Sequence, residues 1–203
     1  MTNYIQKKRK RGDVQDRIIR VLLNYPDGRL SKYRVMILSE GSQTWVYDYI
    51  NQLGKKGYLD NTKVIDIKGL FQLWKKISKK VLIKEYLVKN PMKLLNATER
   101  KYALTTYQAE NLIQNYLFPS RTDIYCKNED QNYWQEKIGK FGQVGKGNFR
   151  IIYDNDHVFF NSTIINNYTI VSTPQLIVDL LKEGGPSVEA AEMLIEKMVS
   201  AYV

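Results

Sequence analysis

Three short stretches with apolar residues at helical spacing fill the first 55 residues of this chain, and a turn signal closes each of them. The first starts at Asp13, a residue type that can cap a helix, and stops before Pro26-Asp27-Gly28. The second follows Ser31, and the third extends from about Gln43 to Lys55 after the turn Glu40-Gly41-Ser42. The pattern predicts three short helices at the N-terminal end of the chain.

A β-hairpin is expected directly after the third helix. Gly57-Tyr58-Leu59 is typical of a helix that stops at a glycine and continues into a strand. Residues 64–67 and 71–74 then flank Lys68-Gly69-Leu70, which contains the glycine of a hairpin turn. Three helices followed by a hairpin form a helix-turn-helix with a β-wing. This order, with the sequence LGKKGYLD ahead of a basic hairpin, resembles the winged-helix family of DNA-binding regulators over residues 13–77.

The positive charge of the chain belongs to one half. Residues 1–90 contain 20 Lys+Arg against 8 Asp+Glu, a net charge of +12, whereas residues 91–203 contain 11 against 13, a net charge of −2. A basic half joined to a near-neutral half indicates a module that meets a polyanion, coupled to a module with another task. Nucleic acid is the expected polyanion, and acidic lipid is the weaker alternative.

The resemblance implies that residues 43–55 form a recognition helix, because this helix follows the turn and can lie in the major groove. Asn51 and Gln43 can read adenine by paired hydrogen bonds, and Thr44 can contact a thymine methyl group or a phosphate. Tyr47 can bond a phosphate, whereas Trp45 fits either the core or a base contact. The predicted DNA contacts are Lys7, Lys8, Arg9, Lys10, Arg11, Ser42, Gln43, Thr44, Tyr47, Asn51, Lys55, Lys56, Lys63 and Lys68.

Some of these contacts have plainer explanations. The run KKRKR at residues 7–11 belongs to an expected basic arm, residues 1–12, which either contacts phosphates or is a solvated tail. The four lysines from Lys55 to Lys68 either neutralise phosphates or are ordinary surface lysines. A few winged helices bind protein or RNA instead of DNA, so these partners stay open.

A linker helix is expected over residues 78–91, ahead of a second domain at residues 92–203. Apolar residues recur among the lysines of residues 75–89, and Asn90-Pro91 ends the pattern. Alternating strands and helices are typical of a mixed α/β domain, so the expected fold class is α+β overall. In that domain the sequence predicts strands at residues 102–105, 122–126, 149–153 and 158–161, and helices at residues 107–116 and 133–138.

Two helices are expected at the end of the chain, after a short strand at residues 170–172. Thr173 is a natural N-cap and Pro174 suits the first helical position of a helix that stops at Gly184. Gly185-Pro186 then opens the last helix.

The residues needed for common catalytic and metal sites are scarce. Cys126 is the one cysteine and His157 the one histidine, so a zinc site of His and Cys lacks ligands. The glycine-rich stretch at residues 139–148 lacks the Ser or Thr that follows the lysine of a P-loop. Asp154-Asn155-Asp156 fits a turn better than a calcium loop. We therefore expect no enzymatic activity, metal or cofactor.

Membrane signals are also missing from the sequence. No apolar run reaches the roughly 18 residues needed to span a bilayer. The basic stretch near Met1 is not followed by the apolar segment of a signal peptide. We expect a soluble, cytoplasmic protein.

The second half has a more specific likeness. The segments YALTTYQAENLIQNY, RTDIYC and YTIVSTPQLIVDLLKEGGPSVEAAEMLIEKM resemble the C-terminal domain of AbiEi-type antitoxins, predicted regulators of viral defence systems, over residues 95–200. A basic winged helix in front is the domain order of that family. The resemblance implies an antitoxin that represses its own operon and counteracts a nucleotidyltransferase-like toxin. Its suggested partner-binding residues are Ser172, Asp179 and Glu189.

Two other functions stay open at this point. The first is a plain winged-helix transcription factor whose second domain senses a small molecule or forms a homodimer. The second is a nucleic-acid-modifying enzyme with a winged-helix reader. A gene for a nucleotidyltransferase-like protein beside this one would favour the antitoxin, and a pocket with two carboxylates and a divalent metal would favour the enzyme.

Overall fold

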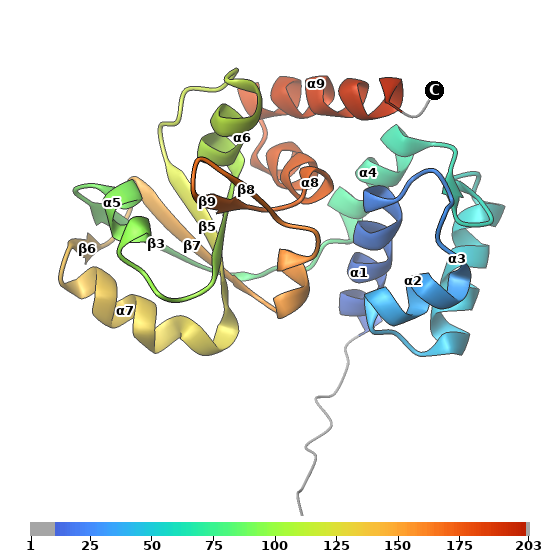
Figure 1. The fold of residues 1–203 in the computed structure, drawn as a ribbon, viewed down its shortest axis with the longest axis horizontal. Coiled ribbons are helices and arrows are strands. Elements are labelled where there is room, and N and C mark those ends of the chain that lie inside the picture. The colour runs from blue at the N-terminus through green and yellow to red at the C-terminus, as the bar shows by residue number, and fades with distance from the viewer. Residues whose placement is uncertain (1–10, 202–203) are drawn as a thin grey trace, which may run out of the picture. The chain divides into compact units, whose positions relative to one another are not determined.

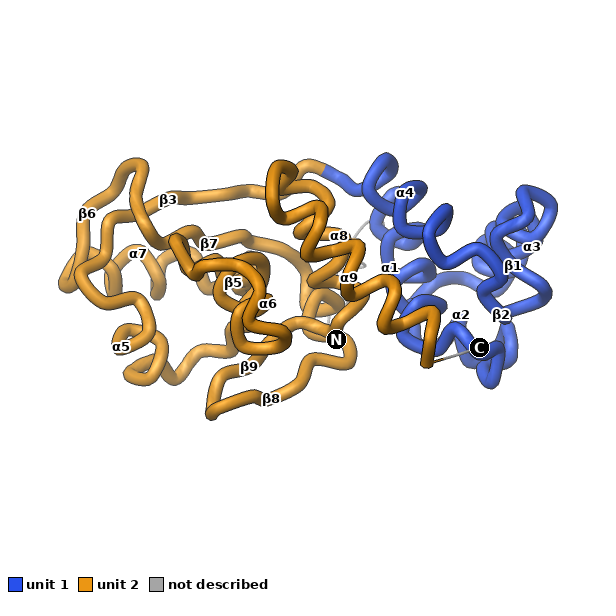
Figure 2. Tube along the Cα trace, turned by 90° about the horizontal axis from the view of Figure 1, so that it is seen from above, with its two compact units in different colours: residues 1–79 blue, residues 80–203 orange. Residues whose placement is uncertain are grey.

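The computed structural model describes residues 11–201 of the chain (Figure 1). The chain divides into two compact units, residues 1–79 and residues 80–203, which we call unit 1 and unit 2 (Figure 2). Unit 1 is helical with one small hairpin, and unit 2 is built on a seven-stranded sheet with helices. The mixed α/β fold class predicted from the sequence is therefore confirmed.

Unit 1 is built around its first helix. The helix α1 has apolar side chains buried along its length, among them Ile18, Ile19 and Leu22, and the other three helices pack on it. The three helices predicted from the sequence are all present, and α3 has the predicted bounds. The elements of unit 1 are α1 (Arg11–Asn24), α2 (Lys32–Ser39), α3 (Gln43–Lys55), β1 (Leu59–Asp60), β2 (Lys63–Val64) and α4 (Ile67–Ile77).

The connections between these helices depend on individual residues. Ser31 caps α2, because its Oγ accepts a hydrogen bond from the backbone N–H of Arg34 at 3.3 Å. Glu40 ends α2 in the left-handed conformation with φ 53°, and its backbone N–H donates to the carbonyl of Ile37. The chain then turns directly into α3.

The hairpin predicted over residues 64–74 is wrong. Residues 67–77 form the helix α4, with buried Leu70, Phe71 and Trp74 on one side. Asp66 caps this helix through a 2.8 Å hydrogen bond from the backbone N–H of Gly69 to Oδ1. A Cβ at position 69 would clash with the carboxylate of Asp66, so the glycine that suggested a turn makes room for the cap.

The hairpin of unit 1 lies earlier in the chain and is shorter. The strands β1 and β2 pair antiparallel, Leu59 opposite Val64 and Asp60 opposite Lys63, with Asn61 in the turn at φ 54°. Asp27, between α1 and α2, forms a single β-bridge with Lys63. The segment that the sequence predicts as the end of a helix is therefore also bridged to this hairpin.

The predicted linker helix at residues 78–91 is also wrong. The helix α4 ends at Ile77, and residues 82–88 form the strand β3, which pairs with β6 on one side and β7 on the other. Tyr86 and Val88 alternate with the exposed Leu87, as in a strand with one buried face. The division of the chain falls between Lys79 and Lys80, ahead of this strand.

Unit 2 contains one mixed sheet with the strand order β6-β3-β7-β5-β4-β9-β8. The β7–β5 and β4–β9 neighbours are parallel, and the other pairs are antiparallel. The elements of unit 2 are β3 (Leu82–Val88), α5 (Pro91–Asn96), β4 (Tyr102–Thr105), α6 (Thr106–Gln114), β5 (Thr122–Lys127), η1 (Asn128–Asp130), α7 (Gln131–Gly139), β6 (Gly142–Val144), β7 (Phe149–Asp154), η2 (Asp156–Phe159), β8 (Thr163–Ile165), β9 (Tyr168–Ile170), α8 (Thr173–Glu183) and α9 (Pro186–Ser200).

Helices cover both faces of this sheet. The helix α8 lies against the face formed by side chains such as Asp123 and Tyr125, and α6 and α9 pack beside it. The helices α5 and α7 lie on the opposite face, where α7 buries Trp134 and Ile138 (Figure 1). The core of unit 2 is therefore formed by two layers of helices around the sheet.

Most elements predicted for the second half are confirmed, with four differences. The strand predicted at residues 170–172 lies two residues earlier, as β9 (Tyr168–Ile170). Residues 156–159 form a short 3-10 helix instead of the predicted strand at 158–161. The glycine-rich stretch contains the edge strand β6, which pairs with β3. The last two helices start and stop as predicted, except that Ser172 is at the N-cap position of α8 and Thr173 is its first residue.

No helix among residues 11–201 is both long and apolar enough to cross a membrane.

The cap of α4 provides a test of the corrected fold. We expect Asp66→Ala to lower the free energy of unfolding by about 1 kcal/mol, because the N–H of Gly69 loses its partner. Urea denaturation of the full chain followed by circular dichroism measures the change. Asp60→Ala, at an exposed aspartate of the hairpin, is the matched control and should change stability by less than about 0.5 kcal/mol. Equal effects of the two substitutions would contradict a capped helix at residues 67–77.

Candidate nucleic-acid interface

The helix α3 has one buried face and one open face. Val46, Tyr49, Ile50 and Leu53 are buried on the inner side. On the outer side Thr44, Asp48, Asn51 and Lys55 are all exposed, at spacings of four, three and four residues. This spacing places the four side chains in a single stripe along the helix. We call these four residues the α3 stripe.

Seven of the nine predicted DNA contacts whose side chains the structure describes lie on this helix or next to its ends. Ser42 stands at its N-cap with an exposed side chain that makes no capping hydrogen bond. Tyr47 is half-buried beside the stripe. The remaining predicted contacts in the described residues are exposed and lie on or next to α3, on β2 or in the first turn of α4: Gln43, Thr44, Asn51, Lys55, Lys56, Lys63 and Lys68.

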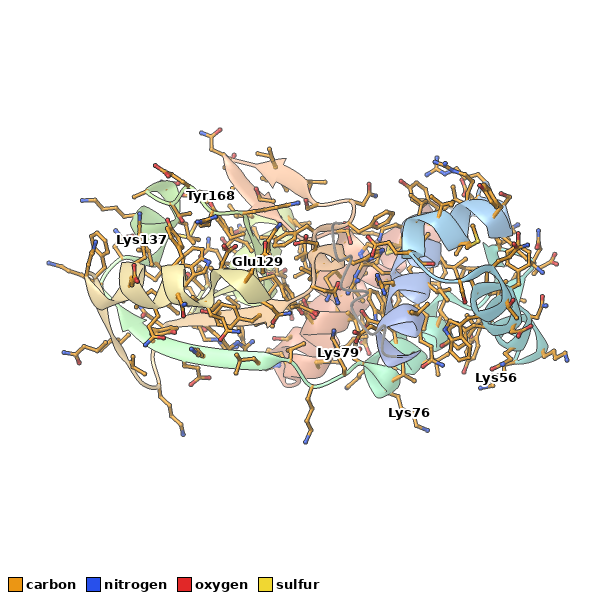
Figure 3. The ribbon with its side chains drawn as sticks, turned by 90° about the horizontal axis from the view of Figure 1, so that it is seen from below. Lys56, Lys76, Lys79, Glu129, Lys137 and Tyr168 are labelled. Carbon is orange, nitrogen blue, oxygen red and sulfur yellow. The ribbon has the colours of Figure 1, made fainter. Side chains whose placement is uncertain are left out.

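The lysines at the helix ends point outward. Figure 3 shows the side chains of Lys56, next to the end of α3, and Lys76, on α4, extending from the surface of unit 1. Lys56 follows the last residue of α3. A positive charge at this position also interacts favourably with the negative end of the helix dipole. These ammonium groups are available to an anionic partner.

The structure bears on the prediction for Trp45, but it does not describe the side chains of the basic run at residues 7–11. Trp45 is half-buried and stacks on Tyr49 with ring centroids 6.3 Å apart, so it packs against the core rather than extending from the stripe. Lys7, Lys8, Arg9 and Lys10 lie outside the described residues. Arg11 is the first residue of α1, and its side chain is also outside the described part.

Arg29 is a basic residue near the hairpin that sequence reasoning missed. Its guanidinium lies over the ring of Tyr25 at 4.8 Å and pairs with Asp27 at 3.5 Å. Because Asp27 forms the bridge to Lys63, Arg29 lies close to β2. The sequence Pro26-Asp27-Gly28 predicts only the end of a helix, so it gives no sign that Arg29 lies close to β2.

The charge asymmetry persists when it is counted for the two units. Residues 1–79 contain 17 Lys+Arg and 7 Asp+Glu, a net charge of +10. Residues 80–203 contain 14 Lys+Arg and 14 Asp+Glu, a net charge of zero. The whole net charge of the chain therefore belongs to the unit that carries the α3 stripe.

One contact within the stripe joins two helices. The Nζ of Lys32, the first residue of α2, donates a hydrogen bond to Oδ1 of Asn51 at 2.7 Å. Asn51 is exposed and Lys32 half-buried, so the pair lies at the surface. The amide of Asn51 is therefore held by a residue outside its own helix.

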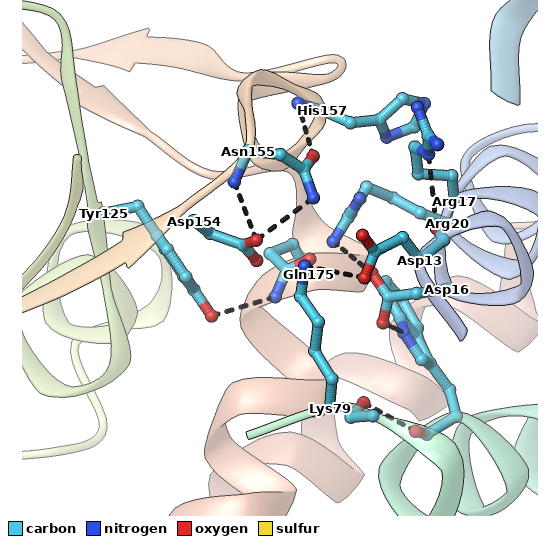
Figure 4. A network of polar contacts seen from close by, with 12 residues as sticks. Asp13, Asp16, Arg17, Arg20, Lys79, Tyr125, Asp154, Asn155, His157 and Gln175 are labelled. Atoms are coloured by element: carbon cyan, nitrogen blue, oxygen red, sulfur yellow. Dashed lines mark hydrogen bonds and ion pairs between the residues drawn. The ribbon is translucent and has the colours of Figure 1, made fainter. Parts of the chain in front are cut away.

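In unit 2, two of the three predicted partner-binding residues are buried. Ser172 and Asp179 are both buried, and only Glu189 is exposed. Asp179 Oδ2 accepts from Thr105 Oγ1 at 2.7 Å, and its Oδ1 accepts from Tyr125 OH and from Gln175 Nε2, both at 2.9 Å. Gln175 also donates to Tyr125, and these two side chains lie close together in Figure 4. Asp179 thus holds α8 on the sheet and is not available at the surface.

A second polar cluster lies further along α8. Arg121 and Arg150 each pair with both Asp123 and Glu183, at distances of 2.6 to 2.7 Å. The two positive and two negative charges balance, and the contacts join β5, β7 and α8. Such mutually paired groups are typical of a structural ion-pair network.

The pKa values of the α8 carboxyl groups shift in opposite directions. Burial raises the pKa of Asp179, and this rise outweighs the effects of Lys182 and the three hydrogen-bond donors. Burial also raises the pKa of Glu183, but the hydrogen bonds and charges of Arg121 and Arg150 lower it more, so its pKa is lowered overall. Both shifts have a structural cause within the network.

The other residues considered for catalysis or metal binding have structural positions. Asn155 caps η2 by accepting from the N–H of His157 at 3.0 Å, and its own backbone N–H donates to Asp154 at 2.7 Å (Figure 4). His157 and Cys126 are buried. Within residues 11–201, no group of three or more His, Cys, Asp or Glu residues is placed to hold a metal ion.

Comparison with known proteins gives no relative. No family model, curated protein or solved structure shows significant similarity to this chain.

The network around Asp179 can be tested by substitution. We expect Asp179→Ala to lower the free energy of unfolding by about 3 kcal/mol, because three buried donors lose their acceptor. Asp179→Asn should cost less, since its amide can still accept at one atom. Glu189→Ala, at an exposed acid, is the control and should stay within about 0.5 kcal/mol. Wild-type stability of Asp179→Ala in urea denaturation would show that Asp179 is not a structural residue.

Proposed function

We propose that this chain is a sequence-specific, double-stranded DNA-binding transcriptional regulator that contacts the major groove through the α3 stripe. The observation that carries the proposal is that the entire net charge of +10 belongs to the unit that exposes this stripe. Phosphate neutralisation by Lys and Arg supplies most of the non-specific affinity for DNA. Polar side chains on an open helix face supply base contacts.

The order of elements in unit 1 supports a winged-helix reading of this surface. Three helices precede the hairpin β1–β2, and the segment at Asp27 pairs with β2 beside it. In winged helices and other helix-turn-helix domains, the helix after the turn enters the major groove. The strands of this hairpin have two residues each, so its phosphate contacts would be few, with Lys63 and Arg29 as the candidates.

The sequence resemblance extends the proposal to an autorepressing antitoxin of an AbiE-like system. Unit 2 would then bind a nucleotidyltransferase-like toxin. Its zero net charge and paired carboxylates support a binding role over a catalytic one. Of the residues suggested for this contact, the exposed Glu189 is the one retained. The alternative is a plain transcription factor, and co-purification with the product of an adjacent toxin-like gene distinguishes the two.

DNA binding should depend steeply on salt. Lysines and arginines of the arm, α3 and the hairpin offer about six phosphate contacts, which gives a slope of log K against log salt of about −5. The double variant Lys55→Gln/Lys56→Gln should reduce the slope by about 2 units. Fluorescence anisotropy with a labelled duplex measures both values on the full chain.

The control for this experiment removes the same charge from unit 2. Lys140→Gln/Lys146→Gln changes two exposed lysines near β6 and should leave the slope unchanged. A wild-type slope shallower than about −2, or equal effects of the two double variants, would overturn the proposed interface.

A further inference from the structure

The contact between Lys32 and Asn51 determines how the Asn51 amide is presented. An ammonium group donates only, so it pairs with the amide oxygen and repels the amide nitrogen. A flip of the amide would place Nδ2–H groups against the Lys32 ammonium. The 2.7 Å contact therefore fixes Oδ1 toward α2 and turns Nδ2 away from it.

The contact also places two donors side by side on the surface. Within the described residues, Nδ2 of Asn51 has no hydrogen-bond partner, so its N–H groups are open to a ligand. The Nζ of Lys32 uses one of its three N–H groups on Oδ1 and keeps two others. The pair thus presents donors from both Lys32 and Asn51, beside an Oδ1 that already accepts a charge-assisted hydrogen bond.

Guanine and adenine present different groups to the donors of Lys32 and Asn51. Guanine shows two acceptors in the major groove, O6 and N7, whereas adenine shows the acceptor N7 beside the donor N6–H₂. The two donors match guanine, and the Lys32 ammonium would face the amino group of adenine with the same polarity. An isolated asparagine favours adenine, so the contact with Lys32 reverses the expectation drawn from Asn51 alone.

We propose that Lys32 and Asn51 act as one unit that reads a guanine in the preferred DNA site, with Asn51 as a base contact and Lys32 as a second donor to the base that also orients the Asn51 amide. The inference rests on the proposed DNA-binding function. It goes further by naming the base that this part of the stripe selects. It also gives Lys32 a role that differs from neutralising a phosphate.

The experiment uses the full chain and a duplex selected from a randomised pool. Each guanine of the selected site is replaced in turn by 7-deazaguanine, which lacks N7, by 2-aminopurine, which lacks O6, and by adenine. We expect one guanine whose replacement by adenine weakens wild-type binding about 5- to 100-fold, with both analogues also weakening it. In Asn51→Ala the 7-deazaguanine effect at that position should disappear, whereas the adenine effect, which reports the group at position 6, should remain because Lys32 still donates there.

Lys32→Met keeps the aliphatic stem and removes the ammonium. It should reduce the preference for guanine over adenine at this one base pair by about 5-fold or more, because the amide becomes free to turn. Lys76→Met, at an exposed lysine of α4, loses the same charge and should leave the preference unchanged. Circular dichroism of each variant confirms that the fold is kept.

The outcomes separate the two proposals. If the wild type does not bind duplex DNA in a salt-dependent manner, the proposed function fails and this inference fails with it. If the wild type binds a preferred site but selects adenine at the position sensitive to Asn51→Ala, the pair does not read guanine. An unchanged base preference in both Lys32→Met and Asn51→Ala would likewise overturn the inference while leaving DNA binding intact.

Discussion

A buried aspartate organises unit 1. Asp16 on α1 accepts a hydrogen bond from the indole Nε1 of Trp74 at 2.5 Å. It also pairs with Arg20 at 2.7 Å (Figure 4). All three residues are buried, so each polar group needs a partner to offset its loss of water. The contact fixes α4 on α1, and α2 and α3 pack on the same central helix. This packing leaves the outer face of α3 exposed. The candidate nucleic-acid interface depends on this exposure.

Local sequence signals predict the first three helices of unit 1 correctly, but they misplace the hairpin and miss α4. The helix α3 could be predicted because its apolar residues recur at helical spacing between the turn at residues 40–42 and Gly57. Residues 67–77 also have helical spacing, at Ile67, Leu70, Phe71 and Trp74, but the glycine at position 69 favoured a hairpin. The structure shows that this glycine is required by the Asp66 cap, a contact that a pattern of apolar residues does not contain.

Elements that depend on distant partners could not be predicted from the sequence. The strand β3 has the lysines and apolar residues of an amphipathic helix, yet it pairs with β6 and β7, which lie about 60 residues later in the chain. The contact between Lys32 and Asn51 joins two helices and has no local signal. Asp179 was placed correctly on a helix, but its inward orientation depends on Thr105 and Tyr125 of two strands.

The central claim is that unit 1 meets DNA through α3. Hydrogen–deuterium exchange of the full chain, with and without a duplex, tests it most directly because every segment is observed at once. The account predicts added protection in peptides that cover α3 and the β1–β2 hairpin, residues 42–64, and unchanged exchange throughout unit 2. Protection confined to unit 2, or exchange in residues 42–64 unaffected by saturating duplex, would contradict it.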